Sequence, residues 1–395
     1  MLPFRIPDLL AMACMAAALL TGCAMTRVAS PAAELPWQDK AFAYDAARVS
    51  ITERSLFEVD PALSTELRSG AVSRANERVR REHLLKLVFG ADLKAFEYAG
   101  GHSTPAAETW RNRRGDCLSL SIMTLALARE LGLEVHVQEV RVPVSFDRRG
   151  GVDFLNKHVN VVMRNETPLQ AFSRRMPAGD IVIDFEPQVG SRQRGTSLSD
   201  QALLARFLSN RGAEHLAEGH DQAAYAHFKA AILADPGYAA VYSNLAQLYL
   251  RHGISEAAEA SLRRALVLDA DSDLALTSLH QLLMSQGRTA EAQMYEQRLL
   301  AQRERDPYYW LGLGIDHLQR GRDAQAVGAL ERAQALSNGF EEVHRFLSIA
   351  YWRTGQRHKA RDQLALLATL EGSSANVAKL SRKFDSALAD PTTLQ

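Results

Sequence analysis

The chain has few cysteines and no excess of charge of either sign. Three cysteines occur in 395 residues, and 46 Lys plus Arg residues balance 46 Asp plus Glu residues. A net charge of zero provides no whole-protein attraction for nucleic acid, so no nucleic-acid partner is expected. The hydrophobic fraction of 47% is typical of a globular chain. At this length we expect two domains, or one domain followed by a repeat array.

The N-terminal apolar run is too short to be a permanent transmembrane helix. The run LLAMACMAAALL covers Leu9–Leu20 and follows Arg5, which is typical of a secretory signal. It ends in the letters LTGC, which close at Cys23 and resemble the lipobox of bacterial lipoproteins. The resemblance implies that residues 1–22 are removed and that a lipid on Cys23 attaches the protein to a membrane.

The residue after Cys23 favours one membrane. In such lipoproteins an aspartate at this position signals retention in the inner membrane, and this chain has Ala24. The resemblance therefore implies an outer-membrane anchor that faces the periplasm. The alternative is a secreted protein with a chance cysteine.

This assignment leaves one cysteine for chemistry. Cys14 is lost with the signal and Cys23 carries the lipid, so no intrachain disulfide can form in a compartment that would permit one. The remaining thiol is Cys117, in the stretch RRGDCLSLS. A free thiol in an oxidising space is a liability unless it is buried or used. Cys117 is therefore either a packed core residue or a nucleophile.

The C-terminal half contains a 34-residue repeat. An alanine stands five residues after each of five glycines, and small residues at such spacing let two helices approach closely. The glycines are Gly219, Gly253, Gly287, Gly321 and Gly355. The pattern resembles the tetratricopeptide (TPR) repeat from Ala205 to Glu371. It predicts an all-α solenoid of five helix pairs over residues 205–374, followed by a C-terminal tail at 375–395.

By this resemblance the concave face of the solenoid binds a protein or an extended peptide. The positions that would line this face become apolar and aromatic toward the later repeats. The candidate partner-binding residues are Tyr308, Leu311, Ile315, Arg345 and Trp352. In the alternative interpretation Tyr308, Leu311 and Trp352 pack on the N-terminal domain or on one another.

The residues before the repeats change from helical to strand periodicity. Apolar spacing predicts a helix that ends at Gly90 and another that runs from Cys117 to Leu131. Short strands are expected after it, at residues 134–142, 158–163 and 180–187. We therefore expect an α+β domain with a small antiparallel sheet. Its expected bounds are residues 46–190, between a tether at 23–45 and a linker at 191–204.

Three residues of this domain resemble a catalytic set. Cys117 opens a helix after the letters GD, His158 opens the second expected strand, and Asp184 lies in the third. Together they resemble the transglutaminase-like branch of the papain-type fold, over about Leu84 to Pro187. The resemblance implies that Cys117 is the nucleophile, that His158 is its base, and that Asp184 orients the imidazole.

These residue types suit acyl transfer on chemical grounds. The positive end of a helix and a neighbouring imidazolium both lower the pKa of a thiol. Histidine titrates near neutrality, so it can take a proton and return it. His136 is a rival base, although no aspartate partner is expected beside it. No calcium-loop pattern occurs, so neither a metal nor a cofactor is expected.

Two functions remain open from the sequence. A lipid-anchored periplasmic enzyme would use Cys117 for acyl transfer, either to water, as a peptidase or amidase, or to an amine, as a transglutaminase. Hydrolysis is favoured because nothing in the sequence indicates an amine site. The alternative is a catalytically inactive transglutaminase-like and TPR scaffold lipoprotein in an envelope complex.

Overall fold

The computed structural model describes residues 35–69, 71–90, 96–140, 142, 146–149, 152–155, 158–165, 169–171, 174–176, 179–187, 194–337, 341–371 and 375–389. The expected signal at residues 1–22, the expected lipid site at Cys23 and the tether up to residue 34 lie outside the described residues. Within the described ranges, no helix combines the length and the apolar character needed to cross a membrane.

Short helices and one strand pair form the first part of the chain. The helices are η2 (Ala46–Arg48), α2 (Glu53–Leu56), α3 (Pro61–Ser69), α4 (Glu77–Phe89), α5 (Ala106–Asn112) and α6 (Cys117–Glu130). The strands β1 (Glu97–Tyr98) and β2 (Arg114–Gly115) pair in parallel. Side-chain oxygens of Asn76 and Asp116 accept backbone N–H groups at the starts of α4 and α6. Gly90 ends α4 with a φ of 66°, as the sequence predicts.

A four-stranded antiparallel sheet follows α6. Its strands are β3 (Val135–Val140), β6 (His158–Met163), β9 (Ile181–Ile183) and β10 (Thr196–Ser197), in the order β10-β3-β6-β9. Two separate hairpins pair β4 (Phe146–Arg149) with β5 (Val152–Leu155) and β7 (Leu169–Ala171) with β8 (Arg174–Met176). The three strands expected from the sequence are therefore confirmed, as is the arrangement of helices followed by a small antiparallel sheet.

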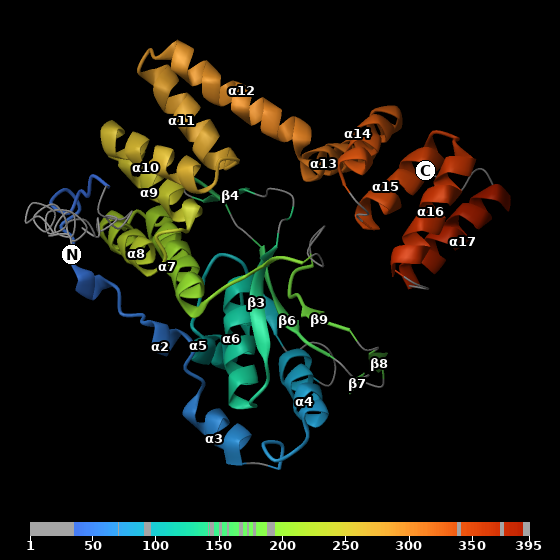
Figure 1. Ribbon diagram of the computed structural model, residues 1–395, viewed down its shortest axis with the longest axis horizontal. Helices are drawn as coiled ribbons and strands as arrows, with labels where there is room; N and C mark the ends of the chain where they lie inside the picture. The colour runs from blue at the N-terminus through green and yellow to red at the C-terminus, as the bar shows by residue number, and fades with distance from the viewer. Residues whose placement is uncertain are drawn as a thin grey trace, which may run out of the picture. The chain divides into compact units, whose positions relative to one another are not determined.

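Helix α6 is the centre of this domain. It packs against β3 and β6 (Figure 1), and helices α3, α4, α5 and α7 (Asp200–Ala217) also contact it. Every residue from Leu118 to Ala128 is buried. A helix that is covered on all sides needs apolar or hydrogen-bonded residues around its whole circumference, which this sequence supplies. The position of Cys117 is therefore fixed by the most deeply buried helix of the domain.

Five helix pairs make up the C-terminal half, and the TPR expectation is confirmed. The pairs are α7 with α8 (Asp221–Ala234), α9 (Ala239–Arg251) with α10 (Ser255–Leu268), α11 (Asp273–Ser285) with α12 (Thr289–Arg305), α13 (Pro307–Gln319) with α14 (Asp323–Leu336), and α15 (Glu341–Arg353) with α16 (Arg357–Glu371). Figure 1 shows the pairs following one another from α7 to α16.

The repeat pattern has a direct physical cause. Each recurring glycine lies in the turn within a pair and has a φ between 69° (Gly253) and 78° (Gly219), where other residues are strained. Each recurring alanine is completely buried where two helices meet, at positions 224, 258, 292, 326 and 360. A larger side chain at these alanines would separate the helices.

The expected linker at 191–204 is largely part of the fold. Strand β10 pairs with β3, and α7 already begins at Asp200. A Cβ atom at Gly195 would lie 2.2 Å from the carbonyl oxygen of Glu139, so only glycine permits this close approach. Arg206 on α7 then pairs with the Glu139 carboxylate at 2.7 Å. The first repeat is thus joined to the sheet by backbone pairing and by charge.

Two other expected irregular segments are also structured. In the expected tether, Phe42 is buried and stacks on Tyr225 of α8, with ring centroids 4.8 Å apart. Asp39 accepts hydrogen bonds from the Tyr225 hydroxyl at 2.8 Å and from Lys229 at 2.7 Å. The expected tail contains α17 (Ala375–Ala389), which contacts α16. Apolar residues within otherwise polar segments, such as Phe42, are the signal for this packing.

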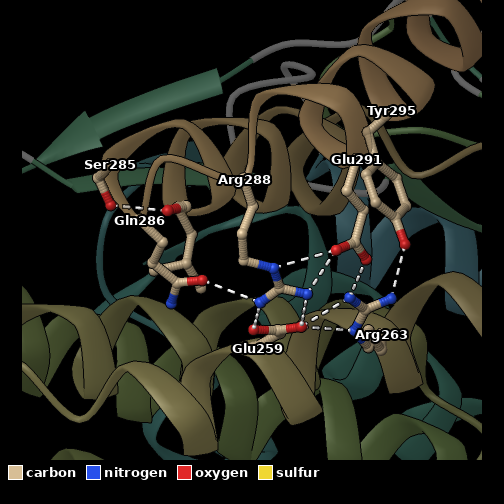
Figure 2. A network of polar contacts seen from close by, with 8 residues as sticks. Glu259, Arg263, Ser285, Gln286, Arg288, Glu291 and Tyr295 are labelled. Carbon is tan, nitrogen blue, oxygen red and sulfur yellow. Dashed lines mark hydrogen bonds and ion pairs between the residues drawn. The ribbon is translucent and has the colours of Figure 1, made fainter.

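A network of charged side chains joins the second and third repeats. Figure 2 shows the Glu259 carboxylate between the guanidinium groups of Arg263 and Arg288. Its oxygens lie 2.6 Å from a nitrogen of each arginine, and both arginines also pair with Glu291. Tyr295 completes the network by accepting a hydrogen bond from Arg263 at 2.8 Å. Because α10 supplies two members and α12 with its N-cap residue supplies three, the network connects neighbouring repeats.

We expect Glu259→Gln to destabilise the solenoid by about 1 kcal/mol, since it leaves two arginines without their shared carboxylate. Hydrogen bonds from Arg288 and Arg263 lower the pKa of Glu259 against the effect of burial. The stabilisation is therefore present above the ordinary glutamate pKa and is lost as the pH falls through the lowered one. Urea unfolding at several pH values measures this, with Glu296→Gln on the exposed surface of α12 as the control. Equal free energies of unfolding for the wild type and Glu259→Gln would contradict it.

Candidate active site

His158 and Asp184 form a buried pair at one end of the sheet. His158 is the first residue of β6, and Asp184 directly follows β9. The Nε2 atom of His158 lies 2.9 Å and 3.0 Å from the two carboxylate oxygens of Asp184. His158 is 2% exposed, and the Asp184 side chain is 8% exposed. The two strands thus bring together the histidine and the aspartate that the sequence proposed as partners.

Cys117 lies beside this pair. Its helix packs against β6, and the backbone N–H of Val159, the residue after His158, is close enough to the thiol to lower its pKa. The other ring nitrogen of His158, Nδ1, is buried and has no hydrogen-bond partner among the described residues. If the carboxylate holds the ring proton on Nε2, the lone pair on Nδ1 is available to accept a proton. The arrangement can therefore deprotonate a group placed next to Nδ1.

The surroundings of Cys117 oppose the thiolate. Burial, followed by the negative charge of Asp116, raises the pKa of Cys117 to about 12, and the carboxylates of Glu186 and Asp184 act in the same direction. The Val159 N–H lowers the thiol pKa, but by less than burial and Asp116 raise it. The helix N-terminus was expected to favour the thiolate, but the loss of solvent and three carboxylates outweigh it. At neutral pH the thiol is protonated.

Asp116 connects Cys117 to the solenoid. One oxygen of its carboxylate accepts the N–H of Ser119 at 2.7 Å, and the other accepts the hydroxyl of Ser103 at 2.5 Å. The same Ser103 hydroxyl accepts a hydrogen bond from Asn210 of α7 at 3.1 Å, and the Ser103 N–H donates to Glu214 of α7 at 2.7 Å. Ser103 and Asp116 are both buried. The cap of the cysteine helix is thus held by the first TPR helix.

Tyr98 and Glu186 also belong to the site, although the sequence did not indicate them. Tyr98 pairs in register with Gly115, two residues before Cys117. The Tyr98 hydroxyl lies near the Glu186 carboxylate, and desolvation together with this carboxylate raises the pKa of the tyrosine. A two-residue strand is too short to show periodicity, and Glu186 follows Asp184 in a loop. The sequence therefore contains no pattern that predicts either residue as part of the site near Cys117.

The rival base His136 is far from the cysteine along the sheet. His136 pairs with Val162 of β6, whereas His158 pairs with Val140 at the other end of β3. Four residues of strand separate the two positions, or about 13 Å. His136 is also exposed. The structure therefore supports His158, and not His136, as the histidine next to Cys117.

The predicted partner-binding residues lie in the interior of the late repeats. Tyr308 and Leu311 are buried at 3% and 0% exposure. Trp352 is buried and stacks on Phe384 of α17, with ring centroids 4.4 Å apart. Ile315 packs partly against the same core, and Arg345 is partly buried. Tyr308, Leu311 and Trp352 are therefore packing residues, as the alternative held, although Trp352 packs on α17 and not on the N-terminal domain.

No protein-family profile matches the chain, and no characterised protein matches its sequence. Among solved structures, the MamA protein is 22% identical over 44% of this chain and 94% of that chain, with a TM-score of 0.24. PilF of Pseudomonas aeruginosa is 21% identical over 49% and 88%, with a TM-score of 0.26. YrrB, described as a TPR protein with an unusual peptide-binding site, is 17% identical over 45% and 92%, with a TM-score of 0.24. Scores this low say nothing about what this chain binds.

We expect Asp116→Asn to make Cys117 more reactive. Asparagine keeps an oxygen for the helix cap and removes the charge that, after burial, contributes most to the raised thiol pKa. A pKa lowered by half a unit increases the thiolate fraction about threefold at a pH below the pKa, so alkylation by iodoacetamide at about pH 8 should accelerate by at least that factor. Peptide mass spectrometry measures the rate.

Glu186→Gln provides an independent test of the same effect, because it removes a second carboxylate without touching the helix cap. Asp180→Asn, an exposed change before β9, serves as the control and should leave the rate unaltered. If both active-site variants fold and react no faster than the wild type, the carboxylates do not control the thiol.

Proposed function

We propose that the protein is a cysteine-dependent acyl-transfer enzyme that hydrolyses its substrate, in the manner of a peptidase or amidase. The buried His158–Asp184 pair next to Cys117, with a free Nδ1 atom, is the observation that carries this proposal. It agrees with the resemblance to the transglutaminase-like branch of the papain-type fold. The lipobox that ends at Cys23 supports a lipid anchor in the outer membrane that faces the periplasm.

The neutral thiol requires assistance from the base during attack. As the Cys117 sulfur bonds to the acyl carbon, its proton passes to Nδ1 of His158, and the leaving group then takes this proton as its bond to carbon breaks. Water attacks the resulting thioester, gives a proton to Nδ1, and the proton returns to the sulfur as the acid is released. Asp184 holds the ring by its Nε2–H and stabilises the imidazolium.

The helix that begins at Cys117 also supports oxyanion stabilisation. N–H groups in the first turn of a helix have no carbonyl partner within that helix, and the helix dipole adds positive charge there. The N–H of Cys117 itself is therefore suited to bind the oxygen of the tetrahedral intermediate. Burial strengthens this interaction, because a low dielectric increases the effect of a fixed donor.

The TPR solenoid supports a role in recruiting a protein or an extended peptide to this enzyme. Stacked helix pairs create an extended surface that suits such partners. The bonds from Asn210 and Glu214 to Ser103 mean that the first repeat touches the residue that holds Asp116. A substrate bound along the repeats would therefore be presented close to the cysteine domain.

A second candidate function is a scaffold without catalysis. The high pKa of Cys117 favours it, because a protonated thiol is a weak nucleophile. In that case the cysteine domain is an enzyme fold that has lost its activity, and the solenoid organises an envelope complex. The two candidates differ in whether His158 controls the chemistry of Cys117.

We expect p-nitrophenyl acetate to acetylate Cys117 and to be turned over by the protein from residue 24 onward. His158→Ala should reduce acylation by about 100-fold or more, in the range of general-base catalysis. Asp184→Asn should reduce it less, since it disturbs the ring orientation and leaves the base in place. Nitrophenolate release and the mass of the peptide containing Cys117 measure the two steps.

His136→Ala is the matched control, because it removes a histidine from the same sheet at a distance from the cysteine. It should leave acylation unchanged, whereas Cys117→Ala should abolish it. Acylation that is equal in the wild type and His158→Ala would exclude the enzyme and favour the scaffold.

A further inference from the structure

Two histidines and a glutamate meet at the first turn of the solenoid. His215 lies in the last turn of α7, Glu218 follows α7, and His220 precedes α8. Gly219 between them has a φ of 78°, which reverses the chain and brings Glu218 and His220 together. One ligand atom from each of the three residues lies within 4.8 Å of the others. The cluster shares no residue with the candidate active site of Cys117, His158 and Asp184.

The three side chains differ in their exposure to solvent. The His215 side chain is 20% exposed, and its buried Nδ1 atom has no hydrogen-bond partner among the described residues. This atom lies 4.0 Å from a carboxylate oxygen of Glu218, and the same oxygen is 3.1 Å from Nδ1 of His220. The Glu218 and His220 side chains are 60% and 64% exposed. Because Glu218 and His220 are exposed, rotation of their side chains alone could close the three ligands around an ion.

The charges around the cluster permit a cation. Arg211 is nearby, but its guanidinium is paired with the Glu214 carboxylate at 2.5 Å. The buried Nδ1 atom of His215 is not used by any other described residue, so it can serve as a ligand atom. The His227 ring lies 4.8 Å from that of His215, and its Nδ1 atom is hydrogen-bonded to the Ala223 carbonyl at 2.8 Å.

The corresponding turn of the fourth repeat lacks two of the three ligands. His317 occupies the same repeat position as His215, and its Nδ1 atom is likewise buried without a partner among the described residues. The positions that correspond to Glu218 and His220 are Arg320 and Arg322. Two arginines would repel a cation, so a buried histidine alone does not make the site. The first repeat has the complete set of two imidazoles and a carboxylate.

We infer that His215, Glu218 and His220 bind one divalent transition-metal ion, with Zn²⁺ as the ion that suits them best. Two imidazoles and a carboxylate form a ligand set that zinc accepts, with a fourth position for water. The ion would join the end of α7 to the start of α8 and so stabilise the first repeat. This site departs from the expectation of no metal, which rested on the absence of a calcium-loop pattern in the sequence.

The test is a titration of the metal-free protein, residues 24–395 without a histidine tag, with Zn²⁺ alone in a calorimeter. One equivalent should bind to the wild type. Glu218→Gln and His220→Ala should each weaken binding at least 10–100-fold, the loss that follows even from removing a supporting residue. Both side chains are exposed, so neither variant should disturb folding. Zn²⁺ should raise the melting temperature of the wild type and not of the two variants.

His317→Ala is the matched control and should bind Zn²⁺ as the wild type does. Co²⁺ in place of Zn²⁺ should produce the visible absorption of a low-symmetry nitrogen and oxygen site, which is lost in His220→Ala. Failure of the wild type to bind one equivalent would overturn the inference. Binding that Glu218→Gln and His220→Ala leave unchanged would also overturn it, because the ion would then lie elsewhere.

Discussion

The burial of α6 is the constraint on which the rest of the structure depends. A helix that is covered on all sides is held in place by its neighbours, and this packing positions Cys117 at its start beside the strand that begins with His158. Cys117 itself is partly buried, and its surroundings, through desolvation and neighbouring carboxylates, raise the pKa of the thiol. The packing around α6 therefore both positions Cys117 and keeps its thiol protonated. The proposed enzyme would therefore depend on its base at the moment of attack, and not on a preformed thiolate.

The second consequence concerns the solenoid. Because β10 joins the sheet and α7 follows almost at once, the first TPR helix lies against the cysteine domain without an intervening spacer. Asn210 and Glu214 reach Ser103, and Ser103 holds the carboxylate that caps α6. A change in the position of α7 would thus alter the hydrogen bonds of the buried cap. Repeats and cysteine domain share polar groups where a flexible connection was expected.

Periodic features were predictable from the sequence, and isolated contacts were not. The five helix pairs follow from glycines that need a positive φ and from alanines that are completely buried. The partnership of His158 with Asp184 followed from strand order and from a family resemblance. Tyr98 and Glu186 could not be found, since each reaches the site through a short pairing or a loop. The docking of Trp37, Phe42 and Tyr44 on Tyr225 was missed because these aromatic residues follow neither a helical nor a strand period.

The most direct measurement is the rate of Cys117 alkylation by a small neutral electrophile, from about pH 6 to about pH 10, in the wild type and His158→Ala. We expect the rate in both proteins to keep rising beyond the ~8.5 of a free thiol, because burial holds the pKa high. At neutral pH the wild type should react faster, since His158 accepts the proton as the sulfur attacks. A Cys117 that reacts equally in both proteins at every pH would contradict the proposed catalytic role and leave the cysteine as a packed residue of the core.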